Sequence, residues 1–181
     1  MAPQVEALKE KADHWAENVR NGWLNRRLAW SGLKKMIWPS LAYPLRICSM
    51  SKKQGNQIVA KLYQALLPEL GVQKKFTRVW RHAPLRLQGL DLPHPYVEQG
   101  IAQSKWFVEA GLSTEINGGL LRTTLEQAQL EIGTSRPVLL ENFATWGHLL
   151  TPNCWIGSLW EFASKYGDSI HHDSHQPPPK Q

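Results

Sequence analysis

Basic and aromatic residues are the most informative residues of this sequence, because they occur together in one short segment. Between Lys74 and Arg86, five lysines or arginines occur without a single acidic residue, and Phe76 and Trp80 lie among them. Lysine and arginine contact phosphate groups, whereas aromatic rings stack on bases. The segment therefore predicts a nucleic-acid-binding surface with the two aromatic residues as stacking candidates. Its phosphate contacts are expected to be Lys74, Lys75, Arg78, Arg81 and Arg86.

The charge of the chain is distributed unevenly along its length. Residues 1–90 contain 16 lysines or arginines against 5 acidic residues, whereas residues 91–181 contain 5 against 10. A basic half of this kind favours a polyanionic partner, and we expect RNA or an RNA–DNA duplex. Binding through phosphate groups depends on salt and shows little sequence preference. Four further lysines are expected to contribute: Lys34, Lys35, Lys52 and Lys53.

The same charge distribution leaves a second interpretation open. The basic half could be merely solvated, while the acidic C-terminal helices bind a protein partner. A steep salt dependence of binding to an RNA–DNA duplex separates the two interpretations, because phosphate contacts release counterions.

Signatures of catalysis are missing from the sequence. Two-metal phosphoryl transfer needs converging carboxylates, but no two acidic residues are adjacent anywhere in the chain. No Gly-x-Ser-x-Gly elbow or phosphate-binding glycine loop occurs. Cys48 and Cys154 are too few for a zinc module, and His171, His172 and His175 lack a folded scaffold for a metal. We therefore expect a protein that is not an enzyme and has no cofactor.

The location of the protein follows from what its apolar segments can do. No run approaches the ~20 apolar residues of a membrane span, and the first residues are polar. Two cysteines suit a reducing compartment. We expect an intracellular protein of the nucleus or cytoplasm, without a membrane partner.

The basic residues must be positioned by helices in the first half of the chain. Residues 5–19 predict a polar helix with few core anchors, and residues 25–38 a second helix that Pro39 kinks or ends. Ser51 and Gln54 form a capping-box pattern that predicts a helix to about Leu67, closed by Pro68 and Gly71. The segment 71–95 alternates basic with apolar residues among prolines, which predicts a loop or a short strand pair.

The second half has a regular helical pattern. One helix is marked by Val97, Ile101, Val108 and Leu112. Three more have apolar residues at offsets of 0, 4, 7 and 11, which place them on one helical face. These sets are Leu121, Leu125, Ala128 and Ile132; Leu139, Phe143, Trp146 and Leu150; and Trp155, Leu159, Phe162 and Tyr166. Thr151 and Pro152 are expected to cap the last helix. The fold class predicted is mainly α, a small helical bundle.

An ordered series of short motifs runs through most of the chain, from about residue 22 to residue 166. The motifs are Leu41-Ala42-Tyr43-Pro44-Leu45, the helix from Ser51 to Leu67, Lys75-Phe76-Thr77-Arg78, Gln88-Gly89-Leu90-Asp91-Leu92-Pro93, Tyr96, Gln99-Gly100-Ile101, Gly119-Leu120-Leu121-Arg122, Leu125-Glu126 and Leu130-Glu131-Ile132-Gly133. In order and spacing they resemble the region that follows the polymerase palm in reverse-transcriptase-like proteins of eukaryotic retroelements. Thr77 departs from that pattern, because it stands where the family has proline.

The resemblance implies a thumb-like helical region that helps to hold a primer–template duplex. It implies a contact role for Lys74, Lys75 and Arg78, which fall in the matching basic segment. The catalytic fingers and palm of an RNA-directed DNA polymerase have no counterpart in this sequence, so no catalytic residue carries over. A non-catalytic fragment of a reverse transcriptase is the leading hypothesis, with a protein-interaction module or a non-functional retroelement remnant as alternatives.

Four parts of the chain are expected on this basis. Residues 1–20 form the polar N-terminal helix, and residues 21–95 the basic thumb-like region with its loop. Residues 96–167 form a C-terminal helical bundle, and residues 168–181 a disordered tail.

Overall fold

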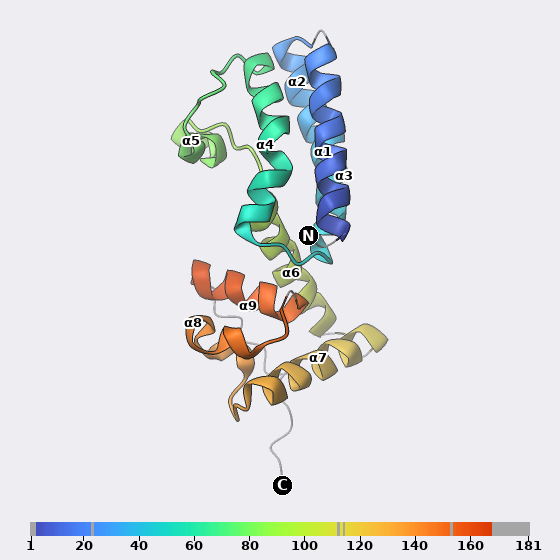
Figure 1. Cartoon of the computed structure of the whole chain (residues 1–181), viewed down its shortest axis with the longest axis vertical. Coiled ribbons are helices and arrows are strands. Elements are labelled where there is room, and N and C mark those ends of the chain that lie inside the picture. Colours follow the sequence, from blue (N-terminus) through green and yellow to red (C-terminus); the bar gives the residue numbers. More distant parts are fainter. Residues whose placement is uncertain (1–2, 23, 112, 114, 153, 168–181) are drawn as a thin grey trace. The chain divides into compact units, whose positions relative to one another are not determined.

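The computed structural model describes residues 3–22, 24–111, 113, 115–152 and 154–167. Every regular element in these ranges is a helix, which confirms the mainly α fold (Figure 1). Internal contacts divide the chain into two compact units, Met1–Gln99 and Gly100–Gln181. The expected tail at 168–181, with its three histidines, lies outside the described residues.

Unit 1 is built on two long helices, α1 (Pro3–Asn21) and α4 (Lys52–Glu69), which run in the same direction and pack side by side (Figure 1). The expectation of few core anchors in α1 is wrong. It buries a residue at each helical turn, namely Val5, Leu8, Ala12, Ala16 and Val19. Alanine carries no side chain beyond Cβ, so Ala12 and Ala16 bring the helix close to its neighbour. This is why a polar-looking helix belongs to the core.

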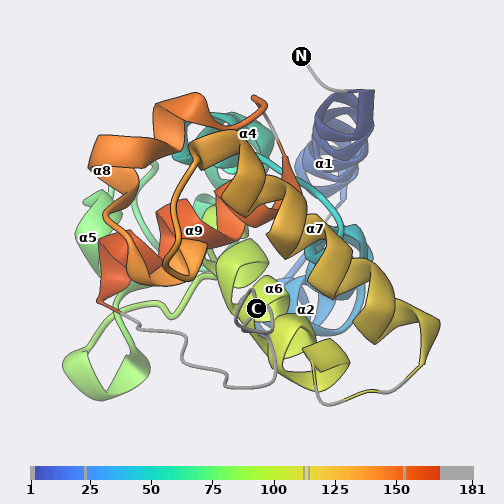
Figure 2. The same cartoon turned by 90° about the horizontal axis from the view of Figure 1, so that it is seen from below.

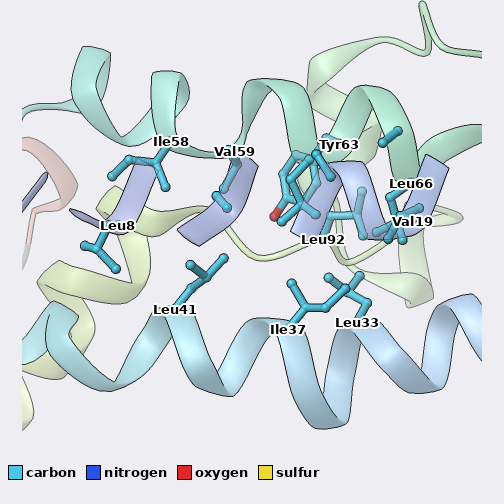
Figure 3. Close-up of a cluster of buried hydrophobic side chains, with 14 of the residues drawn as sticks. Leu8, Val19, Leu33, Ile37, Leu41, Ile58, Val59, Tyr63, Leu66 and Leu92 are labelled. Carbon is cyan, nitrogen blue, oxygen red and sulfur yellow. The ribbon is translucent and has the colours of Figure 1, made fainter. Parts of the chain in front are cut away.

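A third helical line covers this pair. It runs through α2 (Arg26–Gly32), a π-helical turn η1 (Leu33–Ile37), α3 (Trp38–Ala42) and a 3-10 turn η2 (Tyr43–Arg46). Leu33, Ile37 and Leu41 point from it toward the other helices, where they meet residues such as Leu8 and Val59 (Figure 3).

Pro39 does not end this helical line. Proline cannot donate a backbone hydrogen bond and its ring crowds the carbonyl four residues earlier. The preceding turn is widened, so the N–H of Trp38 donates to the carbonyl of Leu33, five residues back. The π turn therefore lets the helix pass through the proline and keeps Leu33, Ile37 and Leu41 on one face.

The predicted start of α4 is confirmed, whereas its end is not at Pro68, because the helix contains Pro68 and runs to Glu69. The N–H of Gln54 donates to Ser51 Oγ at 3.3 Å, and the N–H of Ser51 donates to Gln54 Oε1 at 2.8 Å. This reciprocal pair is the capping box. At the other end, Gly71 adopts a positive φ of 76°, a conformation that glycine adopts without strain.

The segment between α4 and residue 95 contains no strand in the described structure, so the irregular form predicted for it is present and the strand pair is not. A short helix α5 (Arg78–His82) and a 3-10 turn η3 (Leu85–Leu87) stand on the side of α4 away from α1 (Figures 1 and 2). The N–H groups of residues 90, 91 and 92 donate at 2.8–2.9 Å to the carbonyls of Trp80, Ala83 and Arg81. The backbone N–H groups of this loop thus bond to carbonyl groups at the end of α5 and do not form the hydrogen bonds of a β-sheet.

Unit 2 contains two of the three helices with the shared spacing. Helix α7 (Ile116–Ile132) buries the predicted residues, and α9 (Trp155–Tyr166) packs on it (Figure 2). The helix expected through Leu139 and Leu150 is wrong, because that stretch is broken into η4 (Val138–Leu140), α8 (Phe143–Trp146) and η5 (Gly147–Leu149). Asn142 causes the break: its side chain accepts from the N–H of Ala144 at 2.9 Å and starts a new helix.

The predicted cap of α9 is also wrong. Cys154 is the N-cap, and its Sγ accepts from the N–H of Gly157 at 3.2 Å. Thr151 instead donates its N–H, at 3.0 Å, and its hydroxyl, at 3.2 Å, to the carboxylate of Glu131. A charged acceptor is a stronger partner for Thr151 than the helix end.

Helix α6 (Pro95–Gly111) buries a different face from the one predicted. Ile101 and Val108 are exposed, while Gln99 and Gln103 are buried, and Leu112 lies outside the described residues. Within unit 1, Gln99 Oε1 accepts from the N–H of Met50 at 3.1 Å and its Nε2 donates to the Met50 carbonyl at 3.4 Å. A search for apolar residues does not find Gln99, because this polar side chain is buried where it bonds to the backbone N–H and carbonyl of Met50.

Replacing Gln99 with leucine tests this contact, because it keeps the bulk of the side chain and removes both bonds to Met50. A buried backbone group left without a partner costs about 1–3 kcal/mol. We expect the free energy of unfolding, measured by urea denaturation, to fall by at least ~2 kcal/mol. Gln57→Leu, at an exposed site on α4, is the control and should change it by less than ~0.5 kcal/mol. Equal effects at the two sites would contradict the assignment.

Candidate nucleic-acid interface

The predicted phosphate contacts lie on the surface of unit 1. With the exception of Arg81 they are exposed, and none of them forms an ion pair with another described residue. These exposed residues are Lys34, Lys35, Lys52, Lys53, Lys74, Lys75, Arg78 and Arg86. Their charges are therefore not neutralised by acidic side chains of this part of the chain.

Arg81 has a different role from the one predicted. Its Nε donates to the carbonyl of Phe76 at 2.7 Å, and a terminal guanidinium nitrogen donates to the carbonyl of Lys74 at 3.2 Å. The side chain is partly buried and folds back on its own loop. Arg81 thus positions Lys74 and Lys75, and it has fewer donors left for a phosphate.

The two stacking candidates differ in how much of the ring is accessible. Phe76 is half-buried, whereas Trp80 is 47% exposed on α5. Three apolar neighbours that the sequence did not single out are more exposed still: Val79 (74%), Leu85 (59%) and Leu87 (57%). Apolar residues in an alternating segment are expected to be half-buried, so nothing in the spacing signalled their exposure. Trp80 is the better candidate for stacking.

One hollow, of about 400 Å³, brings Lys74 and Lys75 beside Arg20 at the end of α1. Glu69 and Gln64 of α4 also line it. Arg20 was not among the predicted contacts, although it opens the stretch of the sequence that is poorest in acidic residues. Three cations against one carboxylate make this hollow suited to an anion.

A second hollow, of about 460 Å³, gathers other parts of unit 1. Lys34 of the π turn lines it together with two histidines, His82 and His94. Lys52 and Arg78 lie near enough to His94 to affect its charge. Of the nine predicted basic residues, Lys74 and Lys75 line the first hollow and Lys34 lines the second. The other six line neither, namely Lys35, Lys52, Lys53, Arg78, Arg81 and Arg86.

The histidine pair was missed by the sequence analysis. The rings stand edge to face with centroids 5.1 Å apart. His82 Nδ1 lies 2.6 Å from the carbonyl of Leu92, and His94 Nε2 lies 3.1 Å from Asn56 Oδ1. His94 Nδ1 accepts from the N–H of Tyr96 at 3.2 Å. No spacing rule joins residues 82 and 94, because a loop between them brings the rings together.

The pKa of each histidine is lowered, which favours the neutral ring. Burial lowers the pKa of His82, with a smaller contribution from the charges of Arg81 and Arg78. The pKa of His94 is lowered to about 4, mainly by burial and to a smaller extent by His82, Lys52 and Arg78. Nearby, the hydroxyl of Tyr63 donates to the carbonyl of Pro93, and burial raises the pKa of that phenol.

Other kinds of site are not formed by the described residues. No group of three histidines, cysteines or acidic residues in these ranges could hold a metal ion. Cys48 is buried and its pKa is raised by desolvation, so its thiol is poorly reactive. None of the helices that the structure describes has the length and apolarity needed to cross a bilayer.

Comparisons of the chain with protein-family models, curated proteins and solved structures found no match. The resemblance to reverse-transcriptase-like proteins therefore rests on the sequence motifs alone.

The histidine pair predicts how stability depends on pH. Because the pKa of each is lowered in the folded chain, the unfolded chain binds protons first as the pH falls below about 6.5. The free energy of unfolding should be highest above that pH and should fall as the pH decreases toward about 4. Urea denaturation at several pH values measures this.

His94→Gln should flatten that pH dependence, whereas His14→Gln, at an exposed position of α1, should not. A His94→Gln variant with the full pH dependence of the wild type would show that the pair does not titrate in this way.

Proposed function

We propose that this chain binds the sugar–phosphate backbone of nucleic acid without catalysing a reaction, in the manner of the thumb-like region of a reverse transcriptase. The observation that supports this most directly is a set of exposed cations of unit 1 that form no ion pair with the acidic residues that the structure describes. A cation that already had a partner would gain less from a phosphate.

The arrangement of the loop supports the same proposal. Arg81 holds the backbone at Lys74 and Phe76, so the neighbouring lysines are presented from an ordered loop. Ordering a loop in advance reduces the entropy cost of binding. Exposed Trp80 lies in the same segment and could stack on a base at a strand end.

A primer–template duplex of RNA and DNA is the ligand that the resemblance favours. The sequence contains no adjacent pair of acidic residues of the kind that holds two catalytic metal ions. The proposed role is therefore to hold nucleic acid.

The proposal predicts a steep salt dependence of binding. In fluorescence anisotropy with a labelled RNA–DNA duplex between ~50 and ~200 mM salt, log K should fall linearly with log salt. The triple variant Lys74→Ala, Lys75→Ala and Arg78→Ala should bind all duplex sequences more weakly. Its slope should be shallower by about 0.9 for each phosphate that the variant no longer neutralises.

The matched control removes three cations from unit 2, with Lys105→Ala, Arg122→Ala and Lys165→Ala. It changes the net charge equally, so it should lower affinity only through the general field of the protein. The proposal fails if the control abolishes binding while the loop variant does not.

A protein partner remains the second candidate, supported by one surface of unit 2. Ile116, Leu120 and Leu130 are exposed on the face of α7 opposite its buried residues, with Glu126 also exposed on this helix. Exposed apolar residues on one helical face are typical of a protein contact. Binding to the duplex that shows no salt dependence would favour this second candidate.

A further inference from the structure

The second hollow of unit 1 has the volume and lining of a site for a single nucleotide. At about 460 Å³ it is within the range of small-molecule sites. Part of its lining is apolar, and this part includes the aromatic ring of Trp38. The apolar residues are Leu33, Trp38, Leu92, Pro93 and Val97. An unstacked base is commonly held against an aromatic or aliphatic wall of this kind.

The polar part of the hollow offers hydrogen-bond acceptors. His82 Nδ1 faces the carbonyl of Leu92, so the ring proton lies on Nδ1 and Nε2 keeps its lone pair. Among the described residues, that Nε2 has no hydrogen-bond partner. Asp91, whose carboxylate is a second acceptor, is among the residues that line the same hollow. Two acceptors favour a base that presents an amino group, as guanine, adenine and cytosine do and uracil does not.

Cations at the edge of the hollow complement the acceptors. Lys34 lines it, and its ammonium lies 5.6 Å from the centre of the Trp30 ring, which restrains the side chain. Lys52 and Arg78 are close to the histidine pair. Asp91 and Glu98 add negative charge to the hollow itself. A bare phosphate inside it is therefore disfavoured, while a base inside with its phosphate at the edge satisfies both sets of charges.

We propose that this hollow binds one unpaired nucleotide, with the base against Trp38, its amino group toward His82 and Asp91, and its phosphate toward Lys34. The inference rests on the proposed function and deepens it, because backbone contacts alone give no preference among bases. A thumb-like region with this site would hold a duplex by its backbone and select the base of an unpaired end.

Isothermal titration calorimetry of the full chain with guanosine monophosphate, uridine monophosphate and inorganic phosphate tests the proposal. Guanosine monophosphate should bind about 10-fold more tightly than the other two. Asp91→Asn should remove the difference between the nucleotides. Asparagine is suited to that position, because Asp91 has a positive φ of 49° that asparagine also adopts.

Lys34 and Lys35 provide a matched pair of variants. Both are exposed in the same π turn, but only Lys34 lines the hollow. Lys34→Gln should weaken guanosine monophosphate binding about 10-fold, and Lys35→Gln should leave it unchanged within about 2-fold. Equal effects of the two variants, equal binding of the three ligands, or no binding of guanosine monophosphate at millimolar concentration would each overturn the proposal.

The outcome is distinguishable from that for the proposed function. A blunt RNA–DNA duplex contains no unpaired nucleotide, so its salt-dependent binding reports on the backbone contacts alone. Duplex binding with a steep salt slope and no preference for guanosine monophosphate would leave the proposed function intact and refute the nucleotide site. Selective nucleotide binding without a salt-dependent duplex interaction would do the reverse.

Discussion

The close packing of α1 against α4 is the constraint on which the rest of unit 1 depends. Ala12 and Ala16 let the two helices approach, and the third helical line covers them with Leu33, Ile37 and Leu41. Burying an unpaired charge costs far more than exposing it. The cations of the three helices must therefore lie at the surface once this core forms, and the exposed basic surface is a consequence of the packing.

Only a few of these cations form ion pairs or hydrogen bonds that stabilise the fold of unit 1. Lys61 pairs with Asp13 at 2.6 Å between α4 and α1, and Lys11 donates to the carbonyl of Ser40 at 2.9 Å. Arg81 shapes the basic loop, which is tied to α4 where Tyr63 bonds to the carbonyl of Pro93. The contacts that order the loop are made by Arg81, Tyr63, His82 and backbone groups, so the lysines on it remain available to a ligand.

Sequence patterns predicted those elements whose stability is local. The capping box of α4 and the apolar stripe of α7 are such cases, because neighbouring residues alone determine them. The buried Gln99 could not be predicted, since its partner is the backbone of Met50, 49 residues earlier. In the candidate site, charge predicted which residues are exposed. It could not reveal that Arg81 bonds to its own loop, because this depends on how the chain turns before α5. Nor could it reveal the contact of His82 with His94, which depends on the loop after α5.

We propose that unit 1 binds nucleic acid through the loop at residues 74–87. Hydrogen–deuterium exchange of the full chain, with and without an RNA–DNA duplex, tests it most directly because it reports on each segment separately. We expect slower exchange at residues 74–87 in the presence of the duplex and unchanged exchange in α7. Protection of α7 without protection of residues 74–87 would contradict it.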